Sequence, residues 1–584
     1  MKGWGANSGS WRFRVSSVAW ALATALLVPP TAATSGSGEY LQIFCQKHLL
    51  ADPAVPSEIR GRLNGSIKTE ETDEQGRRWQ ATKKGLVSIG SKRPVVGLLV
   101  GKDGLPILEL MGIAAGPDGR LWLATKEGAI CFQPDAPKRE RWFYFWGKWY
   151  LADNDVENLV AESQGAWIRS HSGISHIEFK SYDLERKSAL FEERIRQRHN
   201  RYGYVADSQL PRAGDIASNH PAPTDNDGLW TAIYVGAECF RYAVTHSPKA
   251  LRNARASLAA LMRLESITSI PGFPARALIH RGDYRDPEGE WHWTSDGAWE
   301  WKGDTSSDEL VGHFFAYELA YDLLPAEDDR AVIRPVVARI AGHLIDNGLK
   351  LVGYGGRVTT WGDYSPEYFQ TPNGREEKAL TSLEMLSHLR VAYHVTGQER
   401  FRTEYHRIAN ELGYLRNVVQ GMTETPPEIN YSDEELAFLA WYPLMRVEDE
   451  PQMRGQYRQA LEAFWCRRIR SEANPLWNYI YAAGADAKDY AAEAALRALE
   501  RIPIDTISWA VKNSQRSDLQ LIAAYGRWGE KQASSAIPPN ERRVMKWNGN
   551  PFELDGGDGG RSENDGAFFL LPYWLARFHR LIKP

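Results

Sequence analysis

The chain has 584 residues, 43% hydrophobic and 25% charged, a composition typical of a folded protein with more than one domain. Its 70 Lys and Arg residues nearly balance 74 Asp and Glu residues, so the net charge of −4 gives no electrostatic basis for binding nucleic acid. The four cysteines lie far apart and form no C-x-x-C motif, which argues against a cysteine-based metal or redox site.

The first residues have the pattern of an export signal. Basic residues precede an apolar run from Val18 to Val28, and Thr31-Ala32-Ala33 offers a small-residue cleavage site. The run is shorter than the ~20 apolar residues of a membrane span. We therefore expect a signal peptide over 1–35 and a secreted or periplasmic protein whose mature chain has no membrane span. A retained N-terminal anchor is the alternative.

Residues 70–180 contain three copies of one pattern: DEQGRRWQATKKGLVSI, GPDGRLWLATKEGAICF and ESQGAWIRSHSGISHIEF. Their tryptophans, Trp79, Trp122 and Trp167, are 43 and 45 residues apart, and a glycine follows each at the same distance. Apolar and polar residues alternate around each glycine, which predicts a hairpin. A period of ~40–45 residues with a tryptophan-centred strand predicts propeller blades.

These copies resemble the two-component regulator propeller repeats of extracytoplasmic bacterial sensor regions and some secreted enzymes. Three units fall short of the ~4–8 blades of a closed propeller. Either the preceding segment, 39–72, adds a degenerate blade, or the repeats form an open sheet that packs on the rest of the chain. We expect this β region to cover 36–181.

After Tyr182 the sequence predicts helices, in which strongly apolar segments alternate with amphipathic ones. The apolar segments are 228–246, 307–324, 377–396, 432–447, 475–484 and 564–581. The amphipathic segments are 184–202, 248–265, 327–348, 398–420, 451–470 and 486–500. Six inner and six outer helices in alternation predict an (α/α)6 toroid over 182–584, so the fold class is mainly α with a smaller β region in front.

This architecture resembles that of toroidal glycoside hydrolases and polysaccharide lyases, and the resemblance implies a glycan-active enzyme by analogy. The abundance of tryptophan, with 22 residues, fits such a substrate because indole rings offer flat surfaces for sugar rings. We expect a polysaccharide or oligosaccharide as substrate, no cofactor, and no metal. The sequence does not identify the glycan or the oligomeric state.

The helix expected after Gly303 carries polar residues one turn apart, at Glu309, His313, Tyr317 and Tyr321. We expect this stripe to face a water-filled funnel on the ring axis, although Ser306 and Glu309 also match a capping box. Cleavage of glycans commonly uses two carboxyl groups, one as acid and one as base or nucleophile. The predicted acid is Glu309 and its partner Asp227; the other catalytic candidates are Asp308, His313 and Asp363.

Two long segments ahead of inner helices, 266–303 and 501–563, are candidates for the rim of the funnel. Four tryptophans, Trp291, Trp293, Trp299 and Trp301, flank a Gly297 turn, which predicts a hairpin with its tryptophans on one side. The predicted substrate-binding residues are Tyr317, His280, Arg281, Trp301, Trp361, Trp477, Asn478, Arg516, Trp547, Asn548 and Asp565.

Two alternatives to hydrolysis stay open. A polysaccharide lyase removes the proton beside a uronate carboxyl group, and His280, His313, Tyr317 and Asn478 offer suitable groups. A non-catalytic glycan-binding or sensing protein would explain the sensor-type repeats. The chain has no HExxH, P-loop, G-x-G-x-x-G or G-x-S-x-G motif, which disfavours metalloprotease, nucleotide-dependent and serine-hydrolase chemistry.

Overall fold

The computed structural model describes residues 38–89, 96–285, 287–422, 429–524, 529–544 and 546–583, and all of them belong to one compact unit, Thr34–Pro584. The signal peptide expected over 1–35 lies outside the described residues. Among the helices that are described, none is long and apolar enough to cross a membrane. The boundary between 181 and 182 stays a prediction because both regions belong to this unit.

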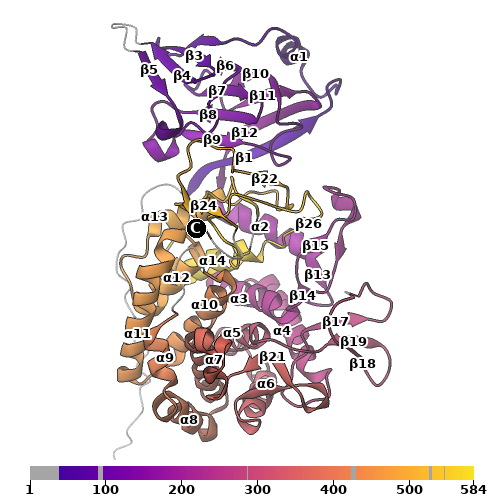
Figure 1. Cartoon of the computed structure of the whole chain (residues 1–584). Coiled ribbons are helices and arrows are strands. Elements are labelled where there is room, and N and C mark those ends of the chain that lie inside the picture. The colour runs from indigo at the N-terminus through magenta and orange to yellow at the C-terminus, as the bar shows by residue number, and fades with distance from the viewer. Residues whose placement is uncertain are drawn as a thin grey trace, which may run out of the picture. The chain divides into compact units, whose positions relative to one another are not determined.

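Each sequence repeat forms one four-stranded antiparallel sheet (Figure 1). The first contains β2 (Glu70–Thr72), β3 (Arg78–Thr82), β4 (Gly85–Ile89) and β5 (Val96–Leu99). The second contains β6 (Gly112–Ala115), β7 (Leu121–Thr125), β8 (Gly128–Phe132) and β9 (Trp142–Phe145). The third contains β10 (Val156–Glu162), β11 (Gly165–Ser170), β12 (Gly173–Asp183) and β1 (Glu39–His48).

The three repeat tryptophans occupy equivalent places. Trp79, Trp122 and Trp167 lie in β3, β7 and β11, and each is buried between its sheet and neighbouring residues. Segment 39–72 adds no further sheet, because β1 pairs along its whole length with β12 and β2 pairs with β3. The repeats are therefore real structural units, while their assignment to the propeller class stays a prediction.

The helical part has two layers. Within the described ranges, the inner helices are α3 (Asp227–Thr245), α5 (Ser307–Leu323), α7 (Pro372–Thr396), α10 (Tyr431–Val447), α12 (Pro475–Ala485) and α14 (Ala567–Phe578). The outer helices are α2 (Leu184–Arg194), α4 (Pro248–Ser266), α6 (Glu327–Asp346), α8 (Glu399–His406), α9 (Tyr414–Gln420), α11 (Pro451–Phe464) and α13 (Ala492–Arg501). The outer helix expected at 398–420 is thus divided into α8 and α9.

The inner helices form a closed ring. Each one packs against the next in chain order, and α14 packs against α3. The first outer helix, α2, contacts the last inner helix, α14, and so covers the closure. Helices α5 and α10 also contact each other across the ring, which narrows its interior. The structure confirms the (α/α)6 fold class, and the reason is local: inner helices are apolar on nearly every side and must be covered on all of them.

The tryptophan-rich segment forms a three-stranded sheet of β17 (Ala277–His280), β18 (Trp291–Trp293) and β19 (Trp299–Lys302). The predicted hairpin is present, but its tryptophans do not share one side. In the register, His292 faces Trp301 and Trp291 faces Lys302, so the tryptophans of the two strands point to opposite faces. Trp301 is buried against His292, with ring centroids 4.4 Å apart. The prediction that these tryptophans share one side of the hairpin is therefore wrong.

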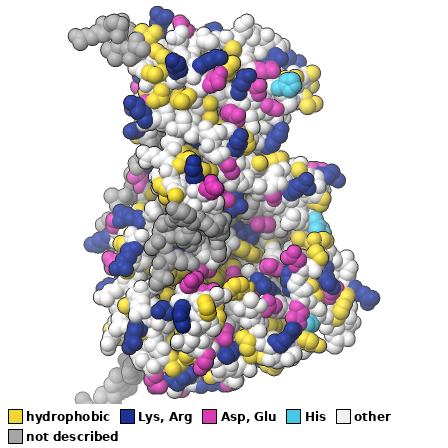
Figure 2. Space-filling view, in the orientation of Figure 1, with side chains coloured by type: hydrophobic (Ala, Val, Ile, Leu, Met, Phe, Trp, Pro, Cys, Tyr) yellow, Lys and Arg dark blue, Asp and Glu magenta, His cyan; other side chains and the backbone are white. Residues whose placement is uncertain are grey.

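Charge is mixed over the surface. On the face shown in Figure 2, Lys and Arg side chains are interspersed with Asp and Glu side chains. This distribution agrees with the small net charge of the sequence.

The packing of α5 on α3 gives a test of the ring. A Cβ atom on Gly312 would lie 2.7 Å from the Leu229 Cα atom, so Gly312→Ala must push two inner helices apart. We expect this variant to lose about 1–3 kcal/mol of unfolding free energy, measured by urea denaturation. Gly455→Ala on α11 is the matched control: its Cβ meets nothing within 4 Å, so it should gain up to about 1 kcal/mol. Equal changes of unfolding free energy in both variants would contradict the close packing of α5 on α3.

Candidate active site

Charged side chains from several inner helices meet at the end of the ring where these helices begin. Asp308 lies in the first turn of α5, Glu435 near the start of α10, and Asp565 two residues before α14. The negative charge of Asp308 raises the pKa of both Glu384 and Glu435, which places these groups near one another. We define the mouth cluster as Asp308, Tyr364, Glu384, His388, Glu435 and Lys546.

The two glutamates of the mouth cluster, Glu384 and Glu435, are buried and form no ion pair with any residue that the structure describes. Within the described residues, the Oε1 atoms of Glu384 and Glu435 have no hydrogen-bond partner. Burial, with a smaller contribution from Asp308, raises the pKa of Glu384 well above its ordinary value. Burial also raises the pKa of Glu435 to about 8, although Lys546 opposes this shift. Burial therefore favours the protonated form of both carboxyl groups, the form that can donate a proton.

Asp308 has a different environment. Its side chain is half-buried, and it has no ion pair or hydrogen bond to any residue that the structure describes. It lies at the N-terminal end of α5, where the helix dipole stabilises a negative charge. The mouth cluster thus combines an accessible carboxylate with buried carboxylic acids.

His388 lies one turn after Glu384 on α7, and its ring stacks on Phe314 of α5 with centroids 4.3 Å apart. Burial lowers the pKa of His388 to about 3, so the imidazole is neutral. Neither of its ring nitrogens, nor the Tyr364 hydroxyl, has a hydrogen-bond partner in the part of the chain that is described. Buried polar atoms left without partners are costly, so a ligand or water at this position would stabilise them.

Lys546 supplies the cation of the mouth cluster. Its Nζ atom lies 3.4 Å from Asp207, 3.3 Å from Asp565 and 3.7 Å from the centre of the Trp230 ring. Burial opposes the charge, but Asp207 and Asp565 outweigh this effect and raise the pKa of Lys546. The lysine therefore stays charged.

The predicted stripe of α5 does not face the ring axis. Glu309 accepts a hydrogen bond from the Gly228 amide at 3.0 Å, so it packs against α3. His313 bonds to Tyr317 at 3.0 Å, and the charges of Glu265 on α4 and Arg339 on α6 act on Tyr317. The expected orientation is thus wrong: this side of α5 lies against neighbouring helices, and the adjacent Asp308 belongs to the mouth cluster instead.

Glu309 nevertheless shares one property with the mouth glutamates. Burial raises its pKa well above the ordinary value, and its Oε2 atom has no hydrogen-bond partner among the described residues. Burial lowers the pKa of His313 to about 3, so this imidazole is neutral.

Asp227 and Asp363 have structural partners. Asp227 forms a buried ion pair with Arg201 at 2.6 Å and accepts a hydrogen bond from the Thr224 amide at 3.0 Å. Asp363 accepts two hydrogen bonds from Ser365 at a turn. The structure does not bring Asp227 or Asp363 into the mouth cluster, because these contacts hold both carboxylates elsewhere.

The predicted binding residues divide into two groups. Asp565 and Trp547 lie beside Lys546, Asn548 is next in the chain, and Trp477 stacks on Phe438 of α10 with its indole nitrogen unpartnered within the described ranges. Asn478 turns outward and accepts a hydrogen bond from Trp465. The others are not brought to the mouth cluster: His280 and Arg281 are exposed on β17 and its turn, Trp301 is buried, Trp361 is exposed, and Arg516 pairs with Asp518 and Glu541.

Of the mouth cluster, the sequence prediction contained only Asp308; it missed Glu384, His388, Lys546, Tyr364 and Glu435. A signal for the first two was present, because Glu384 and His388 have the same four-residue spacing in an apolar helix as Glu309 and His313. Lys546 lies in the long segment 501–563 and carries no such pattern.

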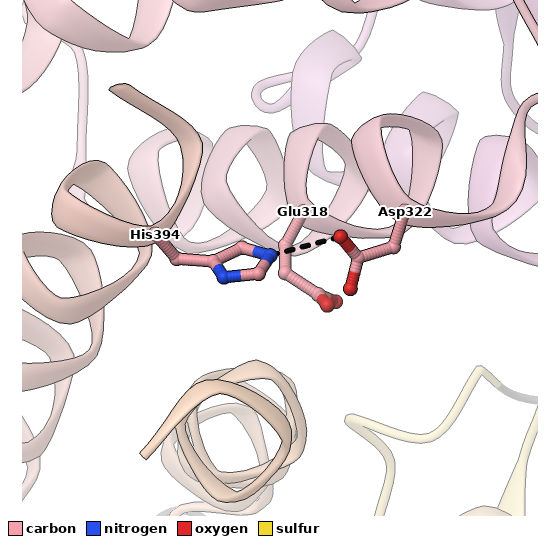
Figure 3. A group of neighbouring side chains, drawn as sticks. All are labelled: Glu318, Asp322 and His394. Carbon is pink, nitrogen blue, oxygen red and sulfur yellow. Dashed lines mark hydrogen bonds and ion pairs between the residues drawn. The ribbon is translucent and has the colours of Figure 1, made fainter. Parts of the chain in front are cut away.

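A second charged group closes the far end of the ring. Arg446 of α10 donates hydrogen bonds to Glu318 at 2.8 Å and Asp322 at 3.0 Å, and Asp322 also pairs with His394 of α7 at 2.8 Å (Figure 3). Glu318, Asp322 and His394 offer three ligand atoms within 4.8 Å of one another, a possible metal geometry. Arg446 and His394 already pair with these two acids, so this group fits an ion-pair network better than a cation site.

No protein-family model matches the chain, and no curated protein matches it in sequence. Among solved structures, the extracellular domain of a hybrid two-component system from Bacteroides thetaiotaomicron is 19% identical over 21% of this chain and 19% of its own length, with a TM-score of 0.17. A family 76 glycoside hydrolase (mannosidase) from Bacteroides thetaiotaomicron is 10% identical over 68% of this chain and 98% of its own, with a TM-score of 0.36. A sugar epimerase from a ruminal bacterium is 11% identical over 68% and 97%, with a TM-score of 0.35. Scores this low assign no activity to the chain.

The raised pKa of Glu435 predicts a pH-dependent stability. A carboxyl group that titrates near 4.5 when unfolded and about 8 when folded stabilises the fold fully below the lower value, and this contribution is lost as pH rises through the upper one. Glu435→Gln stays uncharged. We therefore expect its unfolding free energy, relative to the wild type, to rise from about pH 5 to about pH 8, by up to about 1.4 kcal/mol per pKa unit, and then to level off.

Urea denaturation at a series of pH values measures this difference. Glu327→Gln is the control, because hydrogen bonding to Arg334 lowers the pKa of the exposed Glu327 and its contribution does not change in this interval. A flat difference for Glu435→Gln would show that this carboxyl group is ionised in the folded protein at neutral pH.

Proposed function

We propose that this chain is an exported carbohydrate-active enzyme that hydrolyses glycosidic bonds of a polysaccharide or oligosaccharide at the mouth cluster. The observation that supports it is the contrast between Asp308, an accessible carboxylate, and Glu384, a buried carboxyl group whose pKa is raised. Glycoside hydrolysis commonly needs one protonated and one ionised carboxyl group. A buried carboxyl group beside an accessible one is an arrangement that can supply that pair.

In this proposal Glu384 is the general acid. It donates its proton to the glycosidic oxygen as the bond to the anomeric carbon breaks. Asp308 either removes a proton from the attacking water or attacks the anomeric carbon itself, depending on the separation of the carboxyl groups across the bound sugar. Glu435 is the less suitable acid, because Lys546 opposes the rise of its pKa.

The remaining residues of the mouth have binding roles in this proposal. Glu435 and Lys546 are placed to hydrogen bond with sugar hydroxyl groups, and Trp547 and Trp230 offer aromatic rings beside them. His388 and Tyr364 carry polar atoms that a sugar can partner. Export agrees with a polymeric substrate outside the cell and rests on the signal peptide expected over 1–35.

Elimination from a uronate-containing glycan is the second candidate. The neutral His388 can accept the proton beside the uronate carboxyl group, Tyr364 can donate one to the leaving oxygen, and Lys546 can neutralise the carboxylate. Hydrolysis is the better supported of the two, because one carboxyl group of the pair is buried and the other is accessible.

The test begins with a panel of polysaccharides and two readouts. Hydrolysis produces new reducing ends only, whereas elimination also produces the ultraviolet absorbance of an unsaturated uronate. We expect reducing ends without this absorbance. Both signals together would favour elimination, and binding without any turnover across the panel would favour a non-catalytic glycan-binding protein.

On the substrate identified in this way, variants of the adjacent acids Asp308 and Glu309 distinguish the mouth cluster from the site that the sequence predicts. We expect Asp308→Asn and Glu384→Gln each to lower kcat/KM by about 10²–10⁴-fold. Glu309→Gln should stay within about tenfold of the wild type, because the amide keeps an uncharged side chain against Gly228. All three variants should keep the wild-type circular dichroism spectrum. Loss in Glu309→Gln with activity retained in Asp308→Asn would overturn the assignment.

A further inference from the structure

A cavity of about 600 Å³ lies outside the mouth cluster. Its walls come from β1, from α2 with the helical turn after it, and from the end of α13 with the segment that follows, as far as Ile507. This volume is in the range of sites that bind small molecules in proteins. None of the residues that line it belongs to the mouth cluster.

Aromatic rings form part of the cavity wall. Tyr40 and Phe44 come from β1, Phe143 from β9, and Trp149 from the turn after β9. Rings of this kind bind the apolar faces of sugars. The Trp149 indole N–H donates a hydrogen bond to the Ile507 carbonyl at 2.9 Å, which fixes the indole ring at the cavity wall.

Arg194 and Arg501 place guanidinium groups in the cavity, and neither is in an ion pair with a carboxylate of the described residues. Arg194 donates a hydrogen bond to the Ile504 carbonyl, and Arg501 lies over the Phe143 ring at 5.7 Å. In the described part of the chain, neither forms an ion pair. Burial lowers the pKa of Arg194, so an anion beside it would offset the cost of its burial.

The acids of the cavity are already engaged or weakly charged. Glu563 accepts two hydrogen bonds from Arg198 at 2.6 and 2.7 Å. Asp505 accepts one from the Ile507 amide and one from Trp509, each at 3.0 Å. Burial raises the pKa of Glu500. With Glu140, the cavity lining has four acidic residues against five basic ones, Lys47, Arg194, Arg198, Arg497 and Arg501, so its formal charge is positive by one.

We propose that this cavity binds an acidic sugar residue, carrying a carboxylate or a sulfate, with Arg194 and Arg501 paired to the anion and the aromatic wall against the ring. Guanidinium groups are well suited to both anions because they offer several donors in one plane. Glu563 of β26 (Ser562–Glu563) lines the cavity and lies two residues before Asp565, the ion-pair partner of Lys546. The inference rests on the proposed function for the glycan nature of the ligand.

Calorimetry with the Glu384→Gln protein tests this without turnover. The probes are tetragalacturonate, a sulfated carrageenan tetrasaccharide, neutral mannotetraose and inorganic phosphate. We expect at least one acidic tetrasaccharide to bind tenfold or more tightly than mannotetraose. Adding Arg194→Gln and Arg501→Gln should remove that preference, and lysine at both positions should restore part of it. Which acidic sugar binds more tightly identifies the anion.

Arg402→Gln on α8 is the matched control, since it removes the same charge at an exposed site outside the cavity and should leave the preference unchanged. The inference is overturned if phosphate alone binds as tightly as the acidic sugars, if neither acidic sugar is preferred, or if the double variant loses mannotetraose equally. Acidic binding in the cavity of a protein that cleaves no glycan would refute the proposed function and keep this inference. Normal glycan cleavage without binding of an acidic sugar would refute this inference and keep the proposed function.

Discussion

The closed ring of six helix pairs is the constraint on which the chemistry depends. The middle turns of an inner helix have no face in contact with water, so each ionisable side chain there must be paired or uncharged, and other charges lie near the helix ends. All three outcomes occur. Arg446 pairs with Glu318 and Asp322, Glu384 and His388 are uncharged, and Asp308 lies at a helix start. The mouth cluster lies where the inner helices begin, because an unpaired side chain can keep its charge there.

The sequence predicts the architecture well because its signals are local. Helices that are apolar on all sides alternate with amphipathic ones, and this alternation requires two layers. The repeat spacing of Trp79, Trp122 and Trp167 likewise marks three equivalent strands. Local signals do not predict which strands pair with one another. Strand β1 lies at the edge of the third sheet because it pairs with β12, which is more than a hundred residues later in the chain.

The candidate site is harder to predict for a geometric reason. Successive residues of a helix point about 100° apart, so Asp308 and Glu309 face different neighbours although they are adjacent. A helix that is apolar on every side gives no pattern from which to choose its axial face. The predicted acid, Glu309, therefore packs on Gly228, while Glu384 was overlooked and Lys546 came from an irregular segment. Burial of the mouth glutamates is a property of the assembled ring and of no single segment.

The most direct test of the central claim is a crystal structure of the Glu384→Gln variant with an oligosaccharide of the polysaccharide that the wild type degrades. The account predicts a sugar chain entering the ring where the inner helices begin, with a glycosidic oxygen within hydrogen-bond distance of residue 384 and the anomeric carbon facing Asp308. Sugar bound only against the β sheets or the outer helices, with Asp308 and residue 384 untouched, would contradict it.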